Sequence, residues 1–356
     1  MSKYEIVGLM SGTSLDGLDI VHSRFAKKDE KWTYDILNSE TIPYSGELLA
    51  RLQKATEISE PDLKKLDKDF AHEMALMVNL FLSNRNIDDT TIDAIASHGQ
   101  TVFHQPDKGF SLQIGCGKTL AAETGLPVIN DFRNGDIREG GQGAPLVPIG
   151  DKLLFSDSAS AFLNLGGFCN ISFVNEKEKW IAFDIAPCNL PLNKIANQKG
   201  QEYDKGGEIA KQGTINLFLL DLLNKLEYYN SSYPKSLGTE WLEGKFYPLV
   251  KFSKTPEDNM RTLLDHTAIQ IANVLTVNKL KSVLVTGGGA FNSFLIERIK
   301  HHSDCEVVLP SKEIIEFKEA LIFAFLGALH LNNEPSNVPS ATGARKEVSL
   351  GVLHQS

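Results

Sequence analysis

The sequence has few cysteines, no excess of basic side chains and no long apolar run, and each shortage excludes a class of protein. A net charge of −9 argues against a nucleic-acid groove or a membrane-surface patch, because both need clustered lysine and arginine. No segment approaches the roughly 20 apolar residues of a membrane span, and no basic and apolar signal region precedes the first predicted strand. We therefore expect a soluble, cytoplasmic protein without nucleic-acid or membrane partners.

Cysteine usage indicates a reducing compartment. The four cysteines lie far apart without a C-x-x-C pair, which argues against a disulfide framework and against a zinc site. They are Cys116, Cys169, Cys188 and Cys305.

At 356 residues the chain has room for two domains or one large one, and the elements of its two halves follow a similar order. The first half predicts strands near 4–11, 18–25 and 32–42, helices near 45–57 and 61–85, a strand at 92–97, a helix near 116–124 and a strand at 127–130. The second half predicts strands at 161–165, 168–174 and 180–185, helices to about 277, a strand at 283–285, a helix from about 291, a last helix near 316–330 and an irregular polar surface tail at 332–349.

Each half thus begins with a strand, a glycine turn and a second strand, which is an internal pseudo-repeat of architecture. We predict an α/β fold of two lobes that face each other across a cleft, with helices covering a mixed sheet in each lobe. The first lobe is expected over 1–145 and the second over 146–356. The last helix near 316–330 is a candidate to pack back on the first lobe.

Glycine-rich turns follow four of the predicted strands. They are Gly12–Gly17, Gly140–Gly143, Gly166-Gly167 and Gly287–Gly289. Any single turn is explained equally well as punctuation between elements. Glycine turns that open both lobes can contact a phosphate chain from two sides, and TGGGAFN at 286–292 lets backbone approach a flat ring or a ribose. Asn292 is favoured as a helix cap, with a ligand hydrogen bond as the alternative.

The most informative turn lies in residues 8–19, GLMSGTSLDGLD, which read as a hairpin with exposed backbone N–H groups. Such a turn can cradle phosphate oxygens while a nearby carboxylate, Asp16 or Asp19, holds Mg²⁺ through water. It is neither a Walker lysine loop nor a dinucleotide fingerprint. For this segment alone, an ordinary Gly-Ser hairpin is an equal alternative.

Eight motifs in order resemble the anhydro-N-acetylmuramic acid kinase family, within the actin, hexokinase and Hsp70-like ATPase superfamily with its ribonuclease H-like lobes. The resemblance runs from residue 5 to about residue 353. The motifs are GLMSGTSLDGLD, SHGQTVFH, INDFRNGDI, GGQGAPLVP, NLGGFCNISF, AFDIAPCN, TGGGAFN and KEALIFAFLG…PSATGA.

The resemblance implies an ATP-dependent kinase that acts on 1,6-anhydro-N-acetylmuramic acid during cell-wall (peptidoglycan) recycling. ATP phosphorylates O6 while water attacks C1, which opens the anhydro ring and gives N-acetylmuramic acid 6-phosphate and ADP. As C1 becomes oxocarbenium-like, it needs water and a base, as in an inverting glycosidase. The resemblance also suggests a homodimer.

Asp184 matches the base of that family. It follows the strand predicted at 180–183 and precedes a helix, so we expect it to point into the cleft. A carboxyl with the ordinary pKa of about 3.9 is ionised at neutral pH without tuning. The alternative for Asp184 is a cap of the following helix.

Further family positions match residues expected at the substrates. Arg133 matches an arginine that contacts the sugar, where its guanidinium suits the lactyl carboxylate or the O6 region, and a surface ion pair is its alternative. Glu319 matches a glutamate near the sugar, although a first-turn helix dipole partner is an alternative. His98 and Gln100 are expected to line the sugar pocket, with a core role as the alternative for His98.

The resemblance assigns three of the glycine turns, at 12–19, 166–167 and 287–289, to ATP. It assigns the carboxylates of the first of these turns to Mg²⁺. The expected ATP-binding residues are Gly12, Thr13, Ser14, Leu15, Asp16, Gly17, Leu18, Asp19, Gly166, Gly167, Gly287, Gly288, Gly289 and Asn292. Asp16 and Asp19 are the expected metal residues, through water.

One segment departs from the family pattern. The family has Thr-Gly-Pro-Gly-Asn after its catalytic aspartate, and this chain has Ile-Ala-Pro-Cys-Asn at 185–189, with Asn193 where another aspartate is expected. Both glycines have gained side chains, which keeps backbone further from a ligand. Two alternatives therefore stay open: a kinase of the same fold that phosphorylates a free hydroxyl of another amino sugar, and an ATP-binding protein without catalysis.

Overall fold

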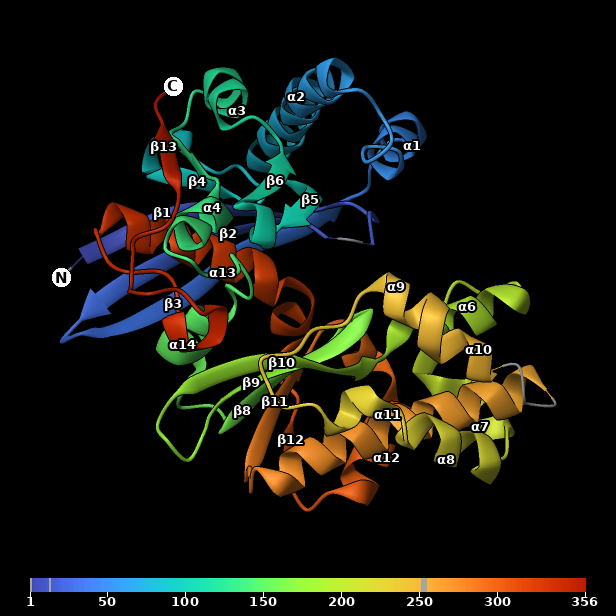
Figure 1. Ribbon diagram of the computed structural model, residues 1–356. Coiled ribbons are helices and arrows are strands. Elements are labelled where there is room, and N and C mark those ends of the chain that lie inside the picture. Colours follow the sequence, from blue (N-terminus) through green and yellow to red (C-terminus); the bar gives the residue numbers. More distant parts are fainter. Residues whose placement is uncertain (1, 13, 251–254) are drawn as a thin grey trace. The chain divides into compact units, whose positions relative to one another are not determined.

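The computed structural model describes residues 2–12, 14–250 and 255–356, and it divides into two compact units (Figure 1). The first unit comprises Met1–Leu154 and Phe317–Ser356, and the second comprises Phe155–Glu316. We expected 146–356 in the second lobe, whereas the whole C-terminal segment from 317 groups with the first unit.

The first unit is built on a six-stranded mixed sheet in the order β13-β7-β4-β1-β2-β3. Its strands are β1 (Ser2–Ser11), β2 (Leu18–Lys28), β3 (Lys31–Ile42), β4 (Ala94–Ser97), β7 (Val128–Asn130) and β13 (Val352–His354), beside a hairpin of β5 (Gln100–Gln105) and β6 (Phe110–Ile114). Its helices are α1 (Gly46–Gln53), α2 (Glu60–Asn84), η1 (Asp89–Thr91), η2 (Pro106–Lys108), α3 (Gly117–Thr124), α4 (Phe132–Arg138), α5 (Pro148–Gly150), η3 (Asp151–Phe155, which crosses the unit boundary), α13 (Lys312–Leu331, which begins in the second unit) and α14 (Pro339–Thr342).

The two faces of the first sheet are covered by different helices, as period-two alternation along β1 requires. Val7 and Leu9 belong to one buried cluster with apolar side chains of α2 and α3. Gly8 lies on the opposite face, where a Cβ would stand 2.3 Å from the Ala320 carbonyl oxygen of α13. A glycine is therefore required at position 8 because the α13 backbone approaches the strand so closely.

The second unit repeats this design in the order β10-β9-β8-β11-β12. Its strands are β8 (Ala161–Leu165), β9 (Phe168–Val174), β10 (Trp180–Pro187), β11 (Ser282–Thr286) and β12 (Glu306–Val308). Its helices are α6 (Asn189–Gln198), η4 (Lys205–Gly207), α7 (Glu208–Gln212), α8 (Leu217–Asn224), η5 (Glu227–Asn230), α9 (Thr239–Trp241), η6 (Leu242–Phe246), α10 (Tyr247–Val250), α11 (Pro256–Val277), η7 (Gly288–Phe291) and α12 (Ser293–His302).

Strand order and direction match between the two units. In each, three consecutive strands form an antiparallel meander, the next strand runs parallel to the first of them, and a fifth runs parallel to the fourth. This is the 3-2-1-4-5 order of the ribonuclease H-like fold. The predicted α/β fold class and its architectural repeat are thereby confirmed.

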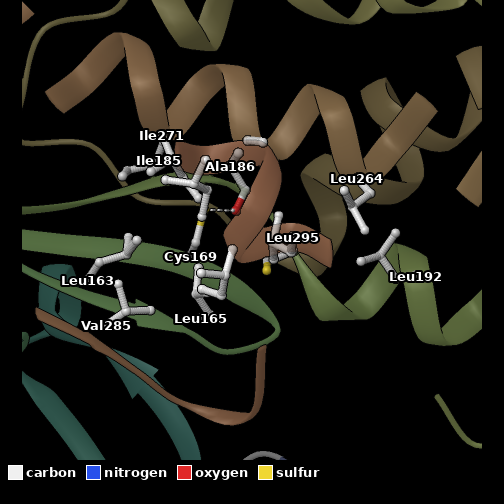
Figure 2. Packing of buried hydrophobic residues seen from close by; sticks show 14 of the residues in the cluster. Leu163, Leu165, Cys169, Ile185, Ala186, Leu192, Leu264, Ile271, Val285 and Leu295 are labelled. Atoms are coloured by element: carbon white, nitrogen blue, oxygen red, sulfur yellow. Dashed lines mark hydrogen bonds between the residues drawn. The ribbon is translucent and has the colours of Figure 1, made fainter. Parts of the chain in front are cut away.

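The core of the second unit lies around the start of β9. Cys169 is fully buried, and its thiol donates a hydrogen bond of 3.3 Å to the Ala186 carbonyl, among cluster members such as Leu165 and Ile271 (Figure 2). Cys188 is also fully buried, and burial raises the pKa of its thiol to about 12. Both cysteines therefore act as small apolar fillers.

The structure departs from the sequence expectations in three further places. The β5–β6 hairpin was not predicted, because its mixed polar pattern has no clear period. Asp184 lies inside β10 at a bulge, rather than after the strand. The tail at 332–349 is mostly irregular, as expected, but it does not lie at the surface throughout, since Ser336 and Thr342 are buried. Among the helices of the described ranges, none is long and apolar enough to cross a bilayer.

Candidate functional site

The turn between β1 and β2 carries the residues of the first unit that were expected to contact phosphate. Leu15 has a positive φ of 55°, and its N–H donates to the Gly12 carbonyl at 3.3 Å. Ser14 donates its hydroxyl to Asp16 Oδ1 at 2.7 Å, and both side chains are exposed. Thr13, an expected nucleotide contact, lies outside the described residues. The turn therefore exposes polar groups at its tip, as the hairpin interpretation requires.

The base of this turn is held by a short chain of buried hydrogen bonds. Tyr44 donates its hydroxyl to Ser11 Oγ at 2.6 Å, and burial raises the pKa of Tyr44 above its ordinary value. Gln100 stands on the other side of Ser11. With its amide nitrogen towards the loop, Gln100 donates to the Ser11 and Gly12 carbonyls at 3.3 and 3.2 Å. Gln100, expected at the sugar, thus supports the turn between β1 and β2.

The charges of both loop carboxylates act on Tyr44. Burial is the main reason for the raised pKa of Tyr44, and the negative charges of Asp19 and Asp16 both add to it. Asp19 Oδ1 accepts a hydrogen bond of 2.6 Å from Thr41 Oγ1 on the neighbouring β3. The described part of the chain has no cluster of three or more histidine, cysteine, aspartate or glutamate side chains that could hold a metal ion. Two carboxylates on one hairpin nevertheless supply the oxygen ligands that suit a hydrated Mg²⁺.

A second group of polar side chains in the first unit centres on Arg133. The residue follows β7 and opens α4, while His98 follows β4, and these two strands are parallel neighbours in the sheet. Arg133 Nε and Nη2 lie 3.1 and 2.9 Å from His98 Nε2. Arg133 Nη1 donates to the Gly143 carbonyl at 2.9 Å. The guanidinium is thus anchored by protein, rather than forming the surface ion pair considered above.

The glycine-rich loop at 139–145 supplies a backbone hydrogen-bond acceptor to Arg133. Asp136 is fully buried, and its Oδ2 accepts a hydrogen bond of 2.8 Å from the Gly143 N–H. The same Gly143 offers its carbonyl to Arg133. A Cβ at Gly141 would stand 2.1 Å from Asp136 Oδ2, so this loop needs glycine to fold around the carboxylate.

Helix α13 brings Glu319 towards Arg133. Burial raises the pKa of Glu319, and the charges of Arg133 and Lys318 oppose that rise. Glu319 lies well beyond the first turn of α13, which begins at Lys312, so the helix-dipole alternative for it does not apply. The adjacent Lys318 forms a buried ion pair of 2.6 Å with Asp151, which the sequence did not indicate.

Asp184 is a half-buried carboxylate on β10 of the second unit. A loop far along the chain wraps around it: the Leu237 N–H donates to Asp184 Oδ2 at 2.8 Å. The Tyr228 hydroxyl donates to the Asp184 carbonyl at 2.6 Å, and the Asp184 N–H donates to the Lys235 carbonyl at 3.3 Å. Asp184 Oδ1 has no protein partner within the described residues, so one oxygen is held and the other is available.

The environment of Asp184 corrects two expectations. Burial raises the pKa of Asp184 above its ordinary value, and the hydrogen bond from the Leu237 N–H limits the rise, so the carboxyl is not left untuned. It also does not cap the next helix, because α6 begins after Cys188. A raised pKa makes the ionised carboxylate a stronger proton acceptor.

The glycine turns of the second unit meet at the ends of β8 and β11. Gly287 has a φ of 80°, and a Cβ there would stand 2.3 Å from Asn164 Oδ1. A Cβ at Gly289 would stand 2.7 Å from Leu165 Cβ. Among the described residues, a Cβ at Gly288 would meet only Asn189 Nδ2, at 3.9 Å. Gly287 and Gly289 are thus required by internal packing, whereas Gly288 leaves room for a ligand.

Asn189 ties these turns together and was absent from the expected site residues. Its Nδ2 donates to the Leu165 carbonyl at 2.9 Å, and its N–H donates to the Gly166 carbonyl at 3.1 Å. Its place in the motif that ends AFDIAPCN was the signal that could have identified it. Asn292 Oδ1 accepts from the Leu295 N–H at 3.0 Å, which confirms the predicted cap of α12.

Comparisons with known proteins agree with these motifs. A family model described as anhydro-N-acetylmuramic acid kinase matches residues 4–356. The anhydro-N-acetylmuramic acid kinases of Haemophilus influenzae and Francisella tularensis are each 37% identical to this chain and cover 99% of it, with 98% and 100% of their own lengths matched.

More distant solved structures also match. Component A of the (R)-2-hydroxyglutaryl-CoA dehydratase of Acidaminococcus fermentans is 12% identical, with a TM-score of 0.46 over 90% of this chain and 96% of its own. A ROK family glucokinase from Streptomyces griseus, solved with glucose and AMPPNP, is 11% identical, with a TM-score of 0.39 over 90% of this chain and 97% of its own.

Proposed function

Because the chain belongs to the anhydro-N-acetylmuramic acid kinase family, we propose that it uses ATP and water to convert 1,6-anhydro-N-acetylmuramic acid into N-acetylmuramic acid 6-phosphate. Membership of that family makes it an ATP-dependent kinase. The substrate and the order of bond changes form the finer part of the proposal. Such a reaction recycles sugar released from the bacterial cell wall.

The proposed reaction balances without a general acid. A water oxygen bonds to C1 as the C1–O6 bond breaks and its electron pair moves to O6. O6 then attacks the γ-phosphorus, and the bond from that phosphorus to the β-phosphate oxygen breaks to release ADP. The proton that remains is the one lost by water, so a single base completes the chemistry.

The observation that carries this proposal is that only one of the two carboxylate oxygens of Asp184 accepts a hydrogen bond from the described residues. Oδ2 is held at 2.8 Å by the Leu237 N–H, while Oδ1 is free of protein partners within the described residues. The first contact sets the orientation of the carboxylate, and the second oxygen can accept a proton from water. The raised pKa of Asp184, which burial causes, suits a general base.

Arg133 supports the proposed choice of substrate. A guanidinium has five N–H donors, and three of those of Arg133 are used on His98 and Gly143. Two remain for a carboxylate, which matches the forked geometry of an arginine–carboxylate pair. We assign these donors to the lactyl carboxylate of the sugar, with Glu319 nearby as an acceptor for sugar hydroxyls.

The glycine turns and the loop carboxylates support ATP and Mg²⁺ binding. We assign the β1–β2 turn and Gly166-Gly167 to the phosphates and Gly288 to the nucleoside, where backbone can approach closely. Asp16 and Asp19 would hold Mg²⁺ through water. When bound, the ion neutralises phosphate charge, which this loop cannot do itself because it has no lysine.

The altered segment at 185–189 fits an active enzyme. Ala186 and Cys188 replace the two family glycines, and both side chains are fully buried in the core of the second unit. They therefore add no obstruction to the exposed side of the turn. This favours the ring-opening kinase over the non-catalytic alternative. The homodimer and the cytoplasmic location stay predictions.

The test compares three sugars in an assay of ADP release: the anhydro sugar, N-acetylglucosamine and N-acetylmuramic acid. In H₂¹⁸O, ring opening places the label at C1, whereas a conventional kinase of a free hydroxyl places none there. Asp184→Asn is expected to lower kcat by about 10²–10⁴ with ATP binding unchanged. Asp221→Asn, an exposed change in α8, is the control. An unlabelled product from the anhydro sugar would refute the mechanism. So would an Asp184→Asn enzyme that turns over within a few-fold of wild type.

A further inference from the structure

His98 has a polar partner on each ring nitrogen. Its Nδ1 lies 2.8 Å from the Gly99 carbonyl, and its Nε2 lies 3.1 and 2.9 Å from Arg133 Nε and Nη2. The ring is only 6% exposed and packs against Phe323 of α13, with ring centroids 4.6 Å apart. No ring nitrogen is left to contact a sugar.

The partners of His98 determine its protonation. Arginine only donates hydrogen bonds, so His98 Nε2 must be the acceptor and the proton must sit on Nδ1, facing the Gly99 carbonyl. Burial, with the charge of Arg133 as the second cause, lowers the pKa of His98 to about 3. The imidazole therefore stays neutral and keeps accepting from Arg133 throughout the neutral range.

This arrangement determines where the guanidinium points. Two of its nitrogens converge on His98 Nε2 and the third reaches the Gly143 carbonyl, so its plane is held from two sides. A free arginine side chain would lose rotamer entropy when it binds a carboxylate, whereas a tethered one has lost it already. His98 thus acts on the ligand through Arg133.

We infer that His98 is a positioning residue that aims Arg133 at the carboxylate of the sugar. This inference rests on the proposed function in one respect, the binding of the sugar carboxylate by Arg133. It replaces direct contact between His98 and the sugar, which was the expectation from sequence. Gln100 has a comparable supporting place beneath the phosphate loop, two residues further along the chain.

Two matched substitutions separate positioning from simple packing. In His98→Gln, the side-chain amide oxygen can occupy the place of Nε2 and accept from Arg133, whereas in His98→Asn it reaches only the place of Nδ1. We expect His98→Asn to raise the KM for the sugar by about 10-fold, because a hydrogen bond to a charged group is lost, and to leave the KM for ATP unchanged. His98→Gln should restore most of the sugar affinity. His72→Ala, an exposed change in α2, is the control.

A second substrate makes the result specific. The 1,6-anhydro sugar without its lactyl group lacks the carboxylate, so the wild-type enzyme should prefer the lactyl sugar. Arg133→Ala should abolish this preference, His98→Asn should weaken it, and His98→Gln should keep it. If Arg133→Ala retains the preference, the assignment of Arg133 to the carboxylate fails and the inference fails with it. If Arg133→Ala abolishes it and His98→Asn does not weaken it, only the inference fails.

A direct measurement covers the case in which a variant does not fold. The ¹⁵N chemical shifts of the wild-type His98 ring should show a protonated Nδ1 and an unprotonated Nε2 at neutral pH. A proton on Nε2 would overturn the inference, because that nitrogen could not accept from Arg133.

Discussion

Replacing Leu237 by proline tests how the second unit controls the pKa of Asp184, the proposed base. Proline has no N–H, so Leu237→Pro removes the hydrogen bond of 2.8 Å that the Leu237 N–H donates to Asp184 Oδ2. Leu237→Ala keeps the N–H and shortens the side chain, which makes it the matched control. Because this bond stabilises the ionised carboxylate, its loss must raise the pKa of Asp184 further above its ordinary value.

The size of the change follows from the worth of one hydrogen bond. A bond to a charged group contributes about 1.5–3 kcal/mol, which corresponds to between one and two pKa units at about 1.36 kcal/mol per unit. Asp184 is partly exposed, so water replaces some of the lost stabilisation. We therefore expect the pKa of Asp184 to rise by about one unit.

The assay is the pH dependence of kcat for the anhydro sugar, followed by ADP release. A base works in its ionised form, so activity is lost as the pH falls through its pKa, and a higher pKa moves that loss to higher pH. Leu237→Pro should shift the acid limb upward by about one unit, while Leu237→Ala leaves it in place. A proline variant that stays folded and keeps the wild-type acid limb would refute the assignment of Asp184 as the base.

Three further changes test other contacts. Gly288→Ala should leave thermal unfolding unchanged, because its Cβ meets no described protein atom closer than 3.9 Å, and should raise the KM for ATP, because that Cβ stands where the nucleoside is assigned. Gly289→Ala should lower the melting temperature, because its Cβ would stand 2.7 Å from Leu165 Cβ. Asp136→Ala should lower the free energy of unfolding by about 3 kcal/mol in denaturant titrations, since it orphans several buried donors. Asn292→Ala should lower it by about 1 kcal/mol through loss of a helix cap, and Asn292→Ser should restore it.

The meander strands and the glycine turns could be predicted because short-range pattern encodes them. Alternating and continuous apolar runs marked β1, β2, β8 and β9, and the turn residues between them marked the hairpins. The place of Arg133 after β7 followed from the same logic. These patterns define an element and its ends. The residues at strand ends were therefore the part of the candidate site that the sequence could predict.

The contacts that tune the site could not be predicted in this way. The donor that holds Asp184 is the backbone N–H of residue 237. Every residue except proline carries a backbone N–H, so the residue type at this position could not indicate the contact. The buried ion pair of Lys318 with Asp151 joins positions that only the folded first unit brings together. The raised pKa of Asp184 depends on burial by such distant segments, and the local sequence does not contain it.

The discontinuity of the first unit has a consequence for its biogenesis. The second unit is one uninterrupted stretch of chain, but the first also needs residues 317–356, which leave the ribosome after the second unit. Until then β7 lacks its β13 neighbour, and Gly8 on β1 faces no helix. The second unit can therefore fold during translation before the first unit, which must wait for residues 317–356.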